Sequence, residues 1–272
     1  MPDLPRSAAR GLGALAGAGF RRWATYRQAA LAGAFTNSVF GVIKVSVLLA
    51  VADSAGGAVA GYDRLGLSTY AWVSQALIAV VVVFGWTEVA ERVRTGDIAI
   101  DLARPVDLQL GFLAADLGRA GFAVLVRAVV PLAVGALTFG LRLPSDPTAI
   151  VLLPVSVVLA VVVSFACRFA VNLAAFWLVD VRGVVTFYVL ASNLLCGLII
   201  PVQLFPTWLA TVAYATPFPS ILQAPTDLVT GQAEGLDAVT TVLVQVAWAI
   251  ATLLLGRVVL GHALHKLVVQ GG

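Results

Sequence analysis

Residues 149–178 read AIVLLPVSVVLAVVVSFACRFAVNLAAFWL, and Arg168 is the only charged residue among them. A helix needs about 20 apolar residues to cross the roughly 30 Å of hydrocarbon in a membrane. This run is longer than that, and it lacks the short alternating strands of a membrane barrel. The stretch therefore predicts a helix that spans a membrane.

The rest of the chain has the same character. Of its 272 residues, 60% are hydrophobic and 11% are charged, and the mean hydropathy is +0.98, far from the mixture found in soluble domains. We predict an all-α, polytopic membrane protein with six transmembrane helices, organised as a single membrane domain over residues 1–272. The expected spans are residues 29–52, 69–87, 116–138, 149–178, 184–204 and 238–260.

Basic residues predict the orientation of these spans, because short cytoplasmic loops carry an excess of Lys and Arg. With six spans both termini share one side, and the opposite loops hold only Arg64 and Arg142 as cations against six acidic residues. We therefore expect cytoplasmic termini, and we interpret the net charge of +3 as a topology signal and not as a nucleic-acid site. The cations on the expected cytoplasmic side are Arg6, Arg10, Arg21, Arg22, Arg27, Arg92, Arg94, Arg104, Arg182 and Lys266.

Residues 10–28 predict an amphipathic helix that lies in the headgroup region before the first span. Three aromatic residues recur there at helical spacing with three arginines beside them: Phe20, Trp23 and Tyr26, with Arg21, Arg22 and Arg27. The segment lacks the cleavage site of a signal peptide, so we expect it to stay on the protein.

The first cytoplasmic loop, residues 88–107, reads EVAERVRTGDIAIDLARPVD and concentrates the charge of the middle of the chain. Gly96 permits a bend, Asp97 favours a helix N-terminus, and Pro105 discourages the helix from continuing past Arg104. These signals predict a short helix over residues 97–103.

The predicted short helix is amphipathic. Asp97, Asp101 and Arg104 recur at one-turn spacing, and Ile98 and Leu102 form a neighbouring apolar stripe. A helix of this kind can dock into a groove of a partner. A solvated loop whose charges only keep it in the cytoplasm explains the spacing equally well.

A resemblance favours docking. The loop resembles that of type-2 ATP-binding cassette (ABC) export permeases, in particular a bacterial branch of multidrug and viologen-exporter-like permeases, and the span number and order agree along the whole chain. The resemblance implies that this loop is the coupling helix that contacts a separate ABC ATPase. It is carried by Glu91, Arg94, Gly96, Asp97, Ile98, Asp101, Leu102, Arg104, Pro105 and Val106, and it implies ATPase-coupling roles for Glu91, Arg94, Gly96, Asp97, Asp101, Arg104 and Pro105.

Residues 205–231, after the fifth span, are apolar but interrupted by proline, too broken to cross as one helix. In the family that the chain resembles, this outer segment is a pair of short re-entrant helices. An ordinary outer loop with interfacial aromatic residues such as Trp208 and Tyr214 is the alternative.

No catalytic machinery is visible in the sequence. There is no G-x-x-x-x-G-K-[ST] phosphate loop, the two histidines lie near the C-terminus, and Cys167 and Cys196 form no metal motif. We expect no enzyme activity, no metal site and no bound cofactor in this chain. ATP and Mg²⁺ would be used by the partner ATPase.

The polar residues within the predicted spans include Lys44, Arg127, Arg168 and Asn193. A cation at mid-membrane costs about 3 kcal/mol on insertion scales, so each should face protein or water. Lys44, Arg127 and Asn193 are candidates for a substrate path. Bonding to neighbouring helices is the alternative for each, and for Arg168 the favoured one. Arg119 is expected to pair with Asp116 at the membrane edge.

Together these observations predict the permease subunit of an ATP-driven exporter of a hydrophobic or amphipathic substrate, in a bacterial plasma (inner) membrane. Its expected partners are ABC ATPase subunits, membrane lipid and a second permease chain, either a copy or a related one. A self-contained secondary transporter is the first alternative, although the spans show no acidic proton site and no matching broken helices. A membrane scaffold subunit without transport activity is the second.

Overall fold

Four long helices dominate the computed structural model, which describes residues 4–266. The predicted domain also includes residues 1–3 and 267–272, which lie outside the described residues. The long helical stretches have the length and hydropathy of membrane spans: α2 (Arg27–Ser54); α6 (Leu108–Ala123) continued by the π-helical turn η1 (Val124–Ala128) and α7 (Val129–Thr138); α8 (Pro147–Asn172) with η2 (Leu173–Phe176); and α12 (Gly235–Leu264). The all-α membrane fold is confirmed.

Two shorter helices occupy the other predicted spans, and both correct the predicted bounds. Helix α3 covers Arg64–Val81 and not residues 69–87, because Val82 adopts a left-handed conformation (φ 51°) that ends it. Helix α9 covers Arg182–Leu195 and not residues 184–204, and Gly197 (φ 83°) lies just beyond its end. The third predicted span, 116–138, begins earlier, at Leu108, where the side chain of Asp107 caps α6.

The remaining elements are short and lie between the long helices. A hairpin of two strands, each of two residues, follows α2 and was not predicted from the sequence. Two short helices occupy the segment predicted to be re-entrant. The bounds are β1 (Ala58–Val59), β2 (Tyr62–Asp63), α4 (Glu88–Thr95), α5 (Ile98–Leu102), η3 (Val202–Leu204), α10 (Thr207–Tyr214), η4 (Phe218–Ser220) and α11 (Gln223–Thr230).

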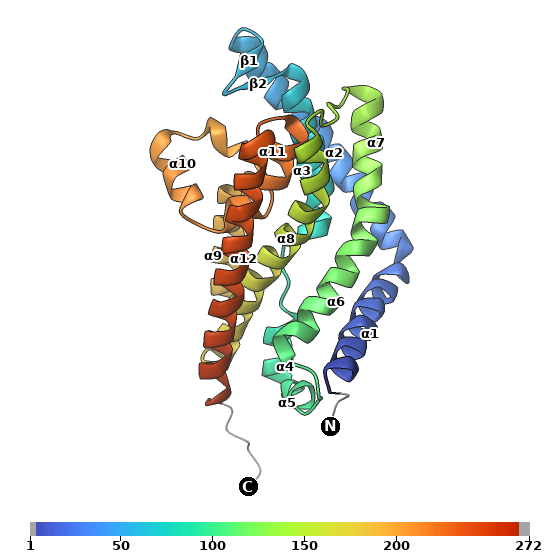
Figure 1. Cartoon of the computed structure of the whole chain (residues 1–272), viewed down its shortest axis with the longest axis vertical. Helices are drawn as coiled ribbons and strands as arrows, with labels where there is room; N and C mark the ends of the chain where they lie inside the picture. Colours follow the sequence, from blue (N-terminus) through green and yellow to red (C-terminus); the bar gives the residue numbers. More distant parts are fainter. Residues whose placement is uncertain (1–3, 267–272) are drawn as a thin grey trace.

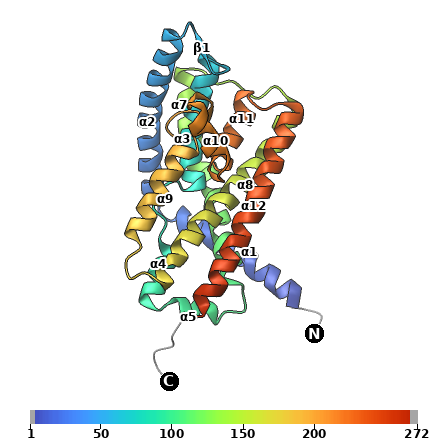
Figure 2. The same cartoon turned by 90° about the vertical axis from the view of Figure 1, so that its left-hand side faces the viewer.

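Helix α3 lies inside the bundle, which explains why it is less apolar than the long helices. Ser68, Thr69, Ser74 and Gln75 are buried in it, and Trp72 is fully buried. The helix packs on α2, α7, α8 and α11. Figure 2 shows α2 and α12 on opposite sides of the bundle, with α3 and α8 between them. Because protein surrounds α3, the hydroxyl groups of Ser68 and Ser74 bond within the protein and not to lipid, whereas Trp72 Nε1 has no partner in the described part of the chain.

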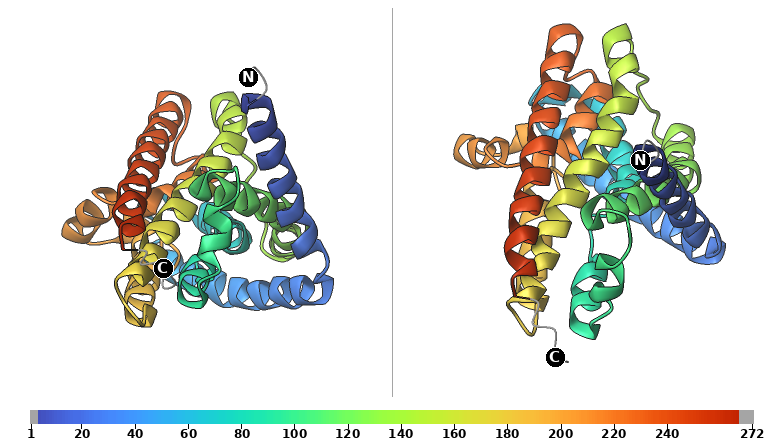
Figure 3. Two further views of the ribbon diagram at one scale, coloured as in Figure 1. Left: turned by 90° about the horizontal axis from the view of Figure 1, so that it is seen from below. Right: turned by 60° about the horizontal axis from the view of Figure 1, so that its bottom comes forward.

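Helix α1 (Leu4–Ala24) includes most of the predicted interfacial segment and packs along α6. The two helices approach closely at Gly19 and Gly118, where a Cβ atom would overlap the carbonyl oxygens of Ala115 and Ala16 respectively. The chain then turns at Tyr26 into α2, so that α1 and α2 form two neighbouring sides of the molecule when it is seen from below (Figure 3).

The two ends of the described chain lie at one end of the molecule, beside α4 and α5 (Figure 1). We call this the α5 end. The β1–β2 hairpin lies at the opposite end, and the short helices α10 and α11 lie in the same half as the hairpin. Among the described residues four helical stretches have the length and hydropathy of membrane spans, and α3 and α9 do not reach them.

Candidate functional site

The charged loop predicted from the sequence forms two short helices at the α5 end. Helix α4 carries Glu88 and Glu91 in its first turn and Arg92 and Arg94 in its last, which suits the helix dipole. The predicted bend is present at Gly96, whose φ of 83° ends α4 in the left-handed region that favours glycine. Pro105 follows α5 and is exposed.

Glu91 and Arg94 form an exposed pair on α4, with Arg94 Nε 3.0 Å from Glu91 Oε2. The hydrogen bonds from Arg94 lower the pKa of Glu91 below its ordinary value. Because both side chains are exposed, the pair contributes little to stability and remains available to a partner.

Helix α5 is shorter than the predicted 97–103 and begins at Ile98. Asp97 precedes it, is exposed, and accepts a hydrogen bond from Thr95 Oγ1 at 2.9 Å. Asp101, expected on the polar outer face, is instead buried, whereas Leu102 is partly exposed. The reason is that Asp101 lies between Arg92 at 2.7 Å and Arg104 at 3.3 Å, which draw its carboxylate inward against α4.

The outer surface of α5 is apolar with a charged rim. Ile100 is 61% exposed and Leu102 is 36% exposed, and Ala99 and Ala103 lie exposed beside them. The exposed guanidinium of Arg104 borders this face. An apolar centre with charged residues around it is the composition of a surface that binds another protein.

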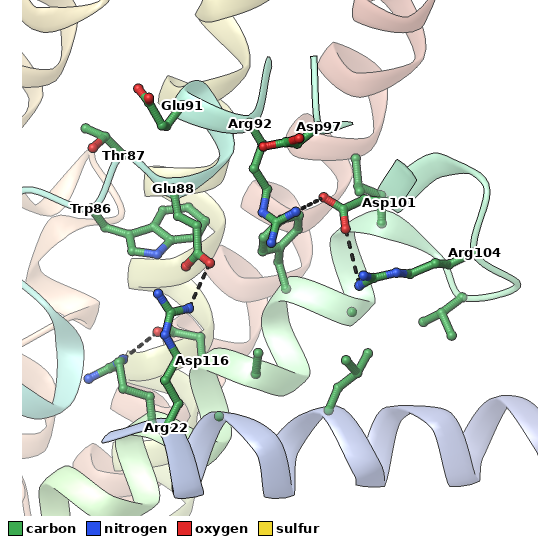
Figure 4. Close-up of a pocket in the computed structure, with 18 of the residues that line it drawn as sticks. Arg22, Trp86, Thr87, Glu88, Glu91, Arg92, Asp97, Asp101, Arg104 and Asp116 are labelled. Carbon is green, nitrogen blue, oxygen red and sulfur yellow. Dashed lines mark hydrogen bonds and ion pairs between the residues drawn. The ribbon is translucent and has the colours of Figure 1, made fainter. Parts of the chain in front are cut away.

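A cavity of about 640 Å³ lies behind this face, between α1, α4, α5 and α6. Figure 4 shows Trp86 and Glu88 on one side of it and Asp101 and Arg104 on another, with Asp116 at the level of α6. Arg22 of α1 reaches across to Glu88 at 2.9 Å. The cavity's acidic residues pair with arginines except Asp97, which accepts from Thr95 Oγ1.

The sequence analysis missed several residues of this site. Arg22 was interpreted as part of the interfacial helix and, like Arg92, as a topology signal, and Trp86 and Phe112 were not singled out. Arg22 reaches the site because α1 folds back along α6, a contact that leaves no periodic signal except the small residues Gly19 and Gly118. Trp86 and Arg92 meet there on the ring of Phe112.

The three candidates for a substrate path lie in separate environments. Lys44 Nζ donates to Ser74 Oγ and to the Leu198 carbonyl, each at 2.7 Å, so its donors serve helix packing. Arg127, in the π-helical turn, lies against Gly33 of α2. Among the described residues, Arg127 Nε and Asn193 Oδ1 are buried without a hydrogen-bond partner.

The fold and the site define a multi-pass α-helical membrane protein with an exposed pair of short helices at the α5 end, where both ends of the described chain lie. Residues 42–271 match the family model described as ABC-2 family transporter protein, and the chain belongs to this family. No curated protein matches the chain. It is therefore a membrane permease of the ABC transporter class, whose members lack ATPase motifs and work with ABC ATPase subunits.

Proposed function

We propose that this chain is the permease subunit of an ATP-driven exporter in a bacterial plasma membrane, with α4 and α5 as the elements that bind the ATPase. The observation that carries the proposal is the exposed apolar face of α5, rimmed by Arg104, on the side of the molecule that holds the termini. The positive-inside pattern places that side in the cytoplasm, where ATP is available.

Two permease chains, either two copies or this chain with a related one, would enclose the path of a hydrophobic or amphipathic substrate. Two ATPase subunits would bind the α4–α5 surfaces and use ATP and Mg²⁺. Glu91, Arg94, Asp97 and Arg104 are exposed and can reach a partner directly. Gly96 and Pro105 shape the loop, and Asp101 fixes the positions of Arg92 and Arg104.

The test is to purify the tagged protein in mild detergent from its own membranes and to identify the proteins that co-purify. We expect a stoichiometric ABC ATPase that is lost or strongly reduced in Ile100→Glu and in Arg104→Glu, because each places a negative charge on the proposed contact. Leu143→Glu is the matched control, since Leu143 is an apolar residue with 82% exposure at the hairpin end.

A chain that purifies without any ATPase would contradict the proposal and favour the secondary transporter. An ATPase that is retained by both variants would show that it binds elsewhere.

A further inference from the structure

Helix α3 and helix α4 are separated by residues 82–87, the last part of the predicted span 69–87, which we call the junction. Val82 and Gly85 both have positive φ values there, 51° and 47°. Such a break leaves free carbonyl groups at the end of α3 and free N–H groups at the start of α4. Away from water these groups need partners from other elements.

Side chains of α6 and α8 supply these partners. Arg119 donates to the carbonyls of Ala79 at 2.7 Å and Val80 at 2.6 Å, and Ser164 donates to that of Val81. On the other side of the break, Asn172 Oδ1 accepts from Ala90 N at 3.1 Å and its Nδ2 donates to the Trp86 carbonyl at 2.9 Å. The α3 end of the break is thus attached to α6 and α8, and the α4 end to α8.

A buried ion cluster joins these attachments to each other. Asp116 accepts from Arg119 at 2.6 Å and from Arg168 at 2.8 Å. Arg168 also lies over the ring of Trp86, 5.3 Å from its centroid, and its carbonyl accepts from Asn172 at 2.8 Å. We call Asp116, Arg119, Ser164, Arg168 and Asn172 the junction cluster; each of them is at most 6% exposed.

A continuous helix would transmit a displacement of α4 to α3 along its own backbone, whereas the irregular junction interrupts this route. Side chains that bond across the junction provide a further route from α4 to the membrane helices, beside the backbone that runs from α5 through residues 103–107 to α6. Charged and bidentate hydrogen bonds are the strong ones, and their directions fix the relative positions of the elements that they join. The charged bonds lie on the α3 side, where Arg119 bonds to two carbonyls, and on the α4 side the amide of Asn172 makes two neutral hydrogen bonds.

We propose that the junction cluster is the positioning device that makes α4 move together with α6 and α8 when a partner displaces α4 and α5. This inference rests on the proposed function for the identity of the partner. It assigns positioning roles to Arg119, Arg168, Asp116 and Asn172, which neither the coupling loop nor the substrate path includes.

The first test uses the solubilised chain alone and does not depend on the ATPase. Arg119→Lys keeps the positive charge beside Asp116 but loses the guanidinium group, whose two terminal nitrogens donate to two carbonyls. Asn172→Leu keeps the size of the side chain but loses its hydrogen bonds. Gln245→Leu is the matched control, because Gln245 is fully buried and donates to the carbonyls of Ser156 and Ser220 away from the junction.

We expect the hydrogen-exchange rate of the backbone amides in residues 86–95 to rise about five-fold in Arg119→Lys and in Asn172→Leu. The thermal unfolding midpoint of these two variants should be no lower than that of Gln245→Leu. Unchanged exchange at residues 86–95 in both variants would overturn the inference, and so would an equal rise in the control.

The second test uses the co-purified complex with spin labels at Leu143→Cys and Leu236→Cys at the hairpin end, in a chain with Cys167→Ser and Cys196→Ser. We expect ATP with vanadate to change the label distances in the otherwise unaltered chain and in Gln245→Leu. In Arg119→Lys and Asn172→Leu the ATPase should remain bound and hydrolyse ATP without this change.

Retention of the change in both junction variants would overturn the inference. If the unaltered complex shows no change, the exporter proposal fails, and the exchange measurement still decides whether the cluster holds α4 to α6 and α8.

Discussion

At the scale of single residues, two glycines set the distance between α1 and α6. A methyl group on Gly118 would overlap the carbonyl oxygen of Ala16, so Gly118→Ala should force the helices apart. Overpacking of this kind typically costs about 1–3 kcal/mol. We expect a lower thermal unfolding midpoint in detergent, measured by differential scanning fluorimetry.

Gly13→Ala is the control for this prediction. Gly13 lies in the same helix α1, and no described atom lies within 4 Å of a Cβ placed there. Alanine also has the higher helix propensity, so this variant should unfold at the same or a slightly higher temperature. Equal midpoints in Gly118→Ala and Gly13→Ala would show that the close approach of α1 to α6 does not contribute to stability.

The residue scale also shows what the sequence could not reveal about the site. The pair Asp116–Arg119 was predicted from its spacing, and the structure confirms it at 2.6 Å. The spacing did not predict that both residues are buried or that Arg168 shares the carboxylate. Spacing along one helix cannot show a partner 52 residues away on another helix.

At the scale of elements, Asp107 connects the start of α6 to α12. Its side chain accepts from Leu110 N at 2.8 Å, and it pairs with Arg257. Partial burial opposes ionisation, but Arg257 and the Leu110 N–H outweigh it and hold the pKa of Asp107 below its ordinary value. The stabilisation is therefore fully present above the ordinary pKa of about 4 and is lost as the pH falls through the lower folded value.

We expect Asp107→Ala to lose about 1 kcal/mol from the cap alone at pH 7. Asp107→Asn retains a capping side chain without the charge, so its thermal unfolding midpoint should lie between those of Asp107→Ala and the unaltered chain. The difference in thermal unfolding midpoint between the unaltered chain and Asp107→Asn should be smaller at pH 3.5 than at pH 7. A difference that is constant between these pH values would contradict the ionised pairing with Arg257.

The elements divide into those that hydropathy predicts and those that it does not. The four long apolar helices follow directly from runs such as residues 149–178, because lipid contact requires continuous apolar surface. Helix α3 and the break after Val81 were not predicted correctly, since the break depends on partners from α6 and α8. The two short helices α10 and α11 agree with the proline-interrupted segment, whereas the β1–β2 hairpin has only Gly57 and Gly61 as a signal.

At the scale of the whole molecule, the proposed orientation makes a prediction about access from outside the cell. Gly57 lies in the loop before the hairpin, and Thr95 lies at the α5 end. In a chain with Cys167→Ser and Cys196→Ser, we expect Gly57→Cys to react with a membrane-impermeant maleimide in intact cells. Thr95→Cys should react only after the cells are lysed.

Both native cysteines are replaced so that only the introduced thiol can react. Cys167 in particular is partly exposed in the structure, whereas Cys196 is buried. The background chain without added cysteine is the control for unspecific labelling. If Thr95→Cys reacts in intact cells and Gly57→Cys does not, the proposed topology is contradicted. Helices α4 and α5 would then lie outside the cell, where they could not meet an ATPase that uses cytoplasmic ATP.

The ion cluster of Asp116, Arg119 and Arg168 also has a consequence for how the chain is made. Helix α6 emerges from the ribosome with one acid and one base that neutralise each other, whereas α8 brings a single arginine to the bilayer. The carboxylate that pairs with Arg168 is synthesised 52 residues earlier. The carboxylate is therefore already synthesised when α8 enters the bilayer, and pairing with it would spare α8 the cost of an unpaired charge in lipid.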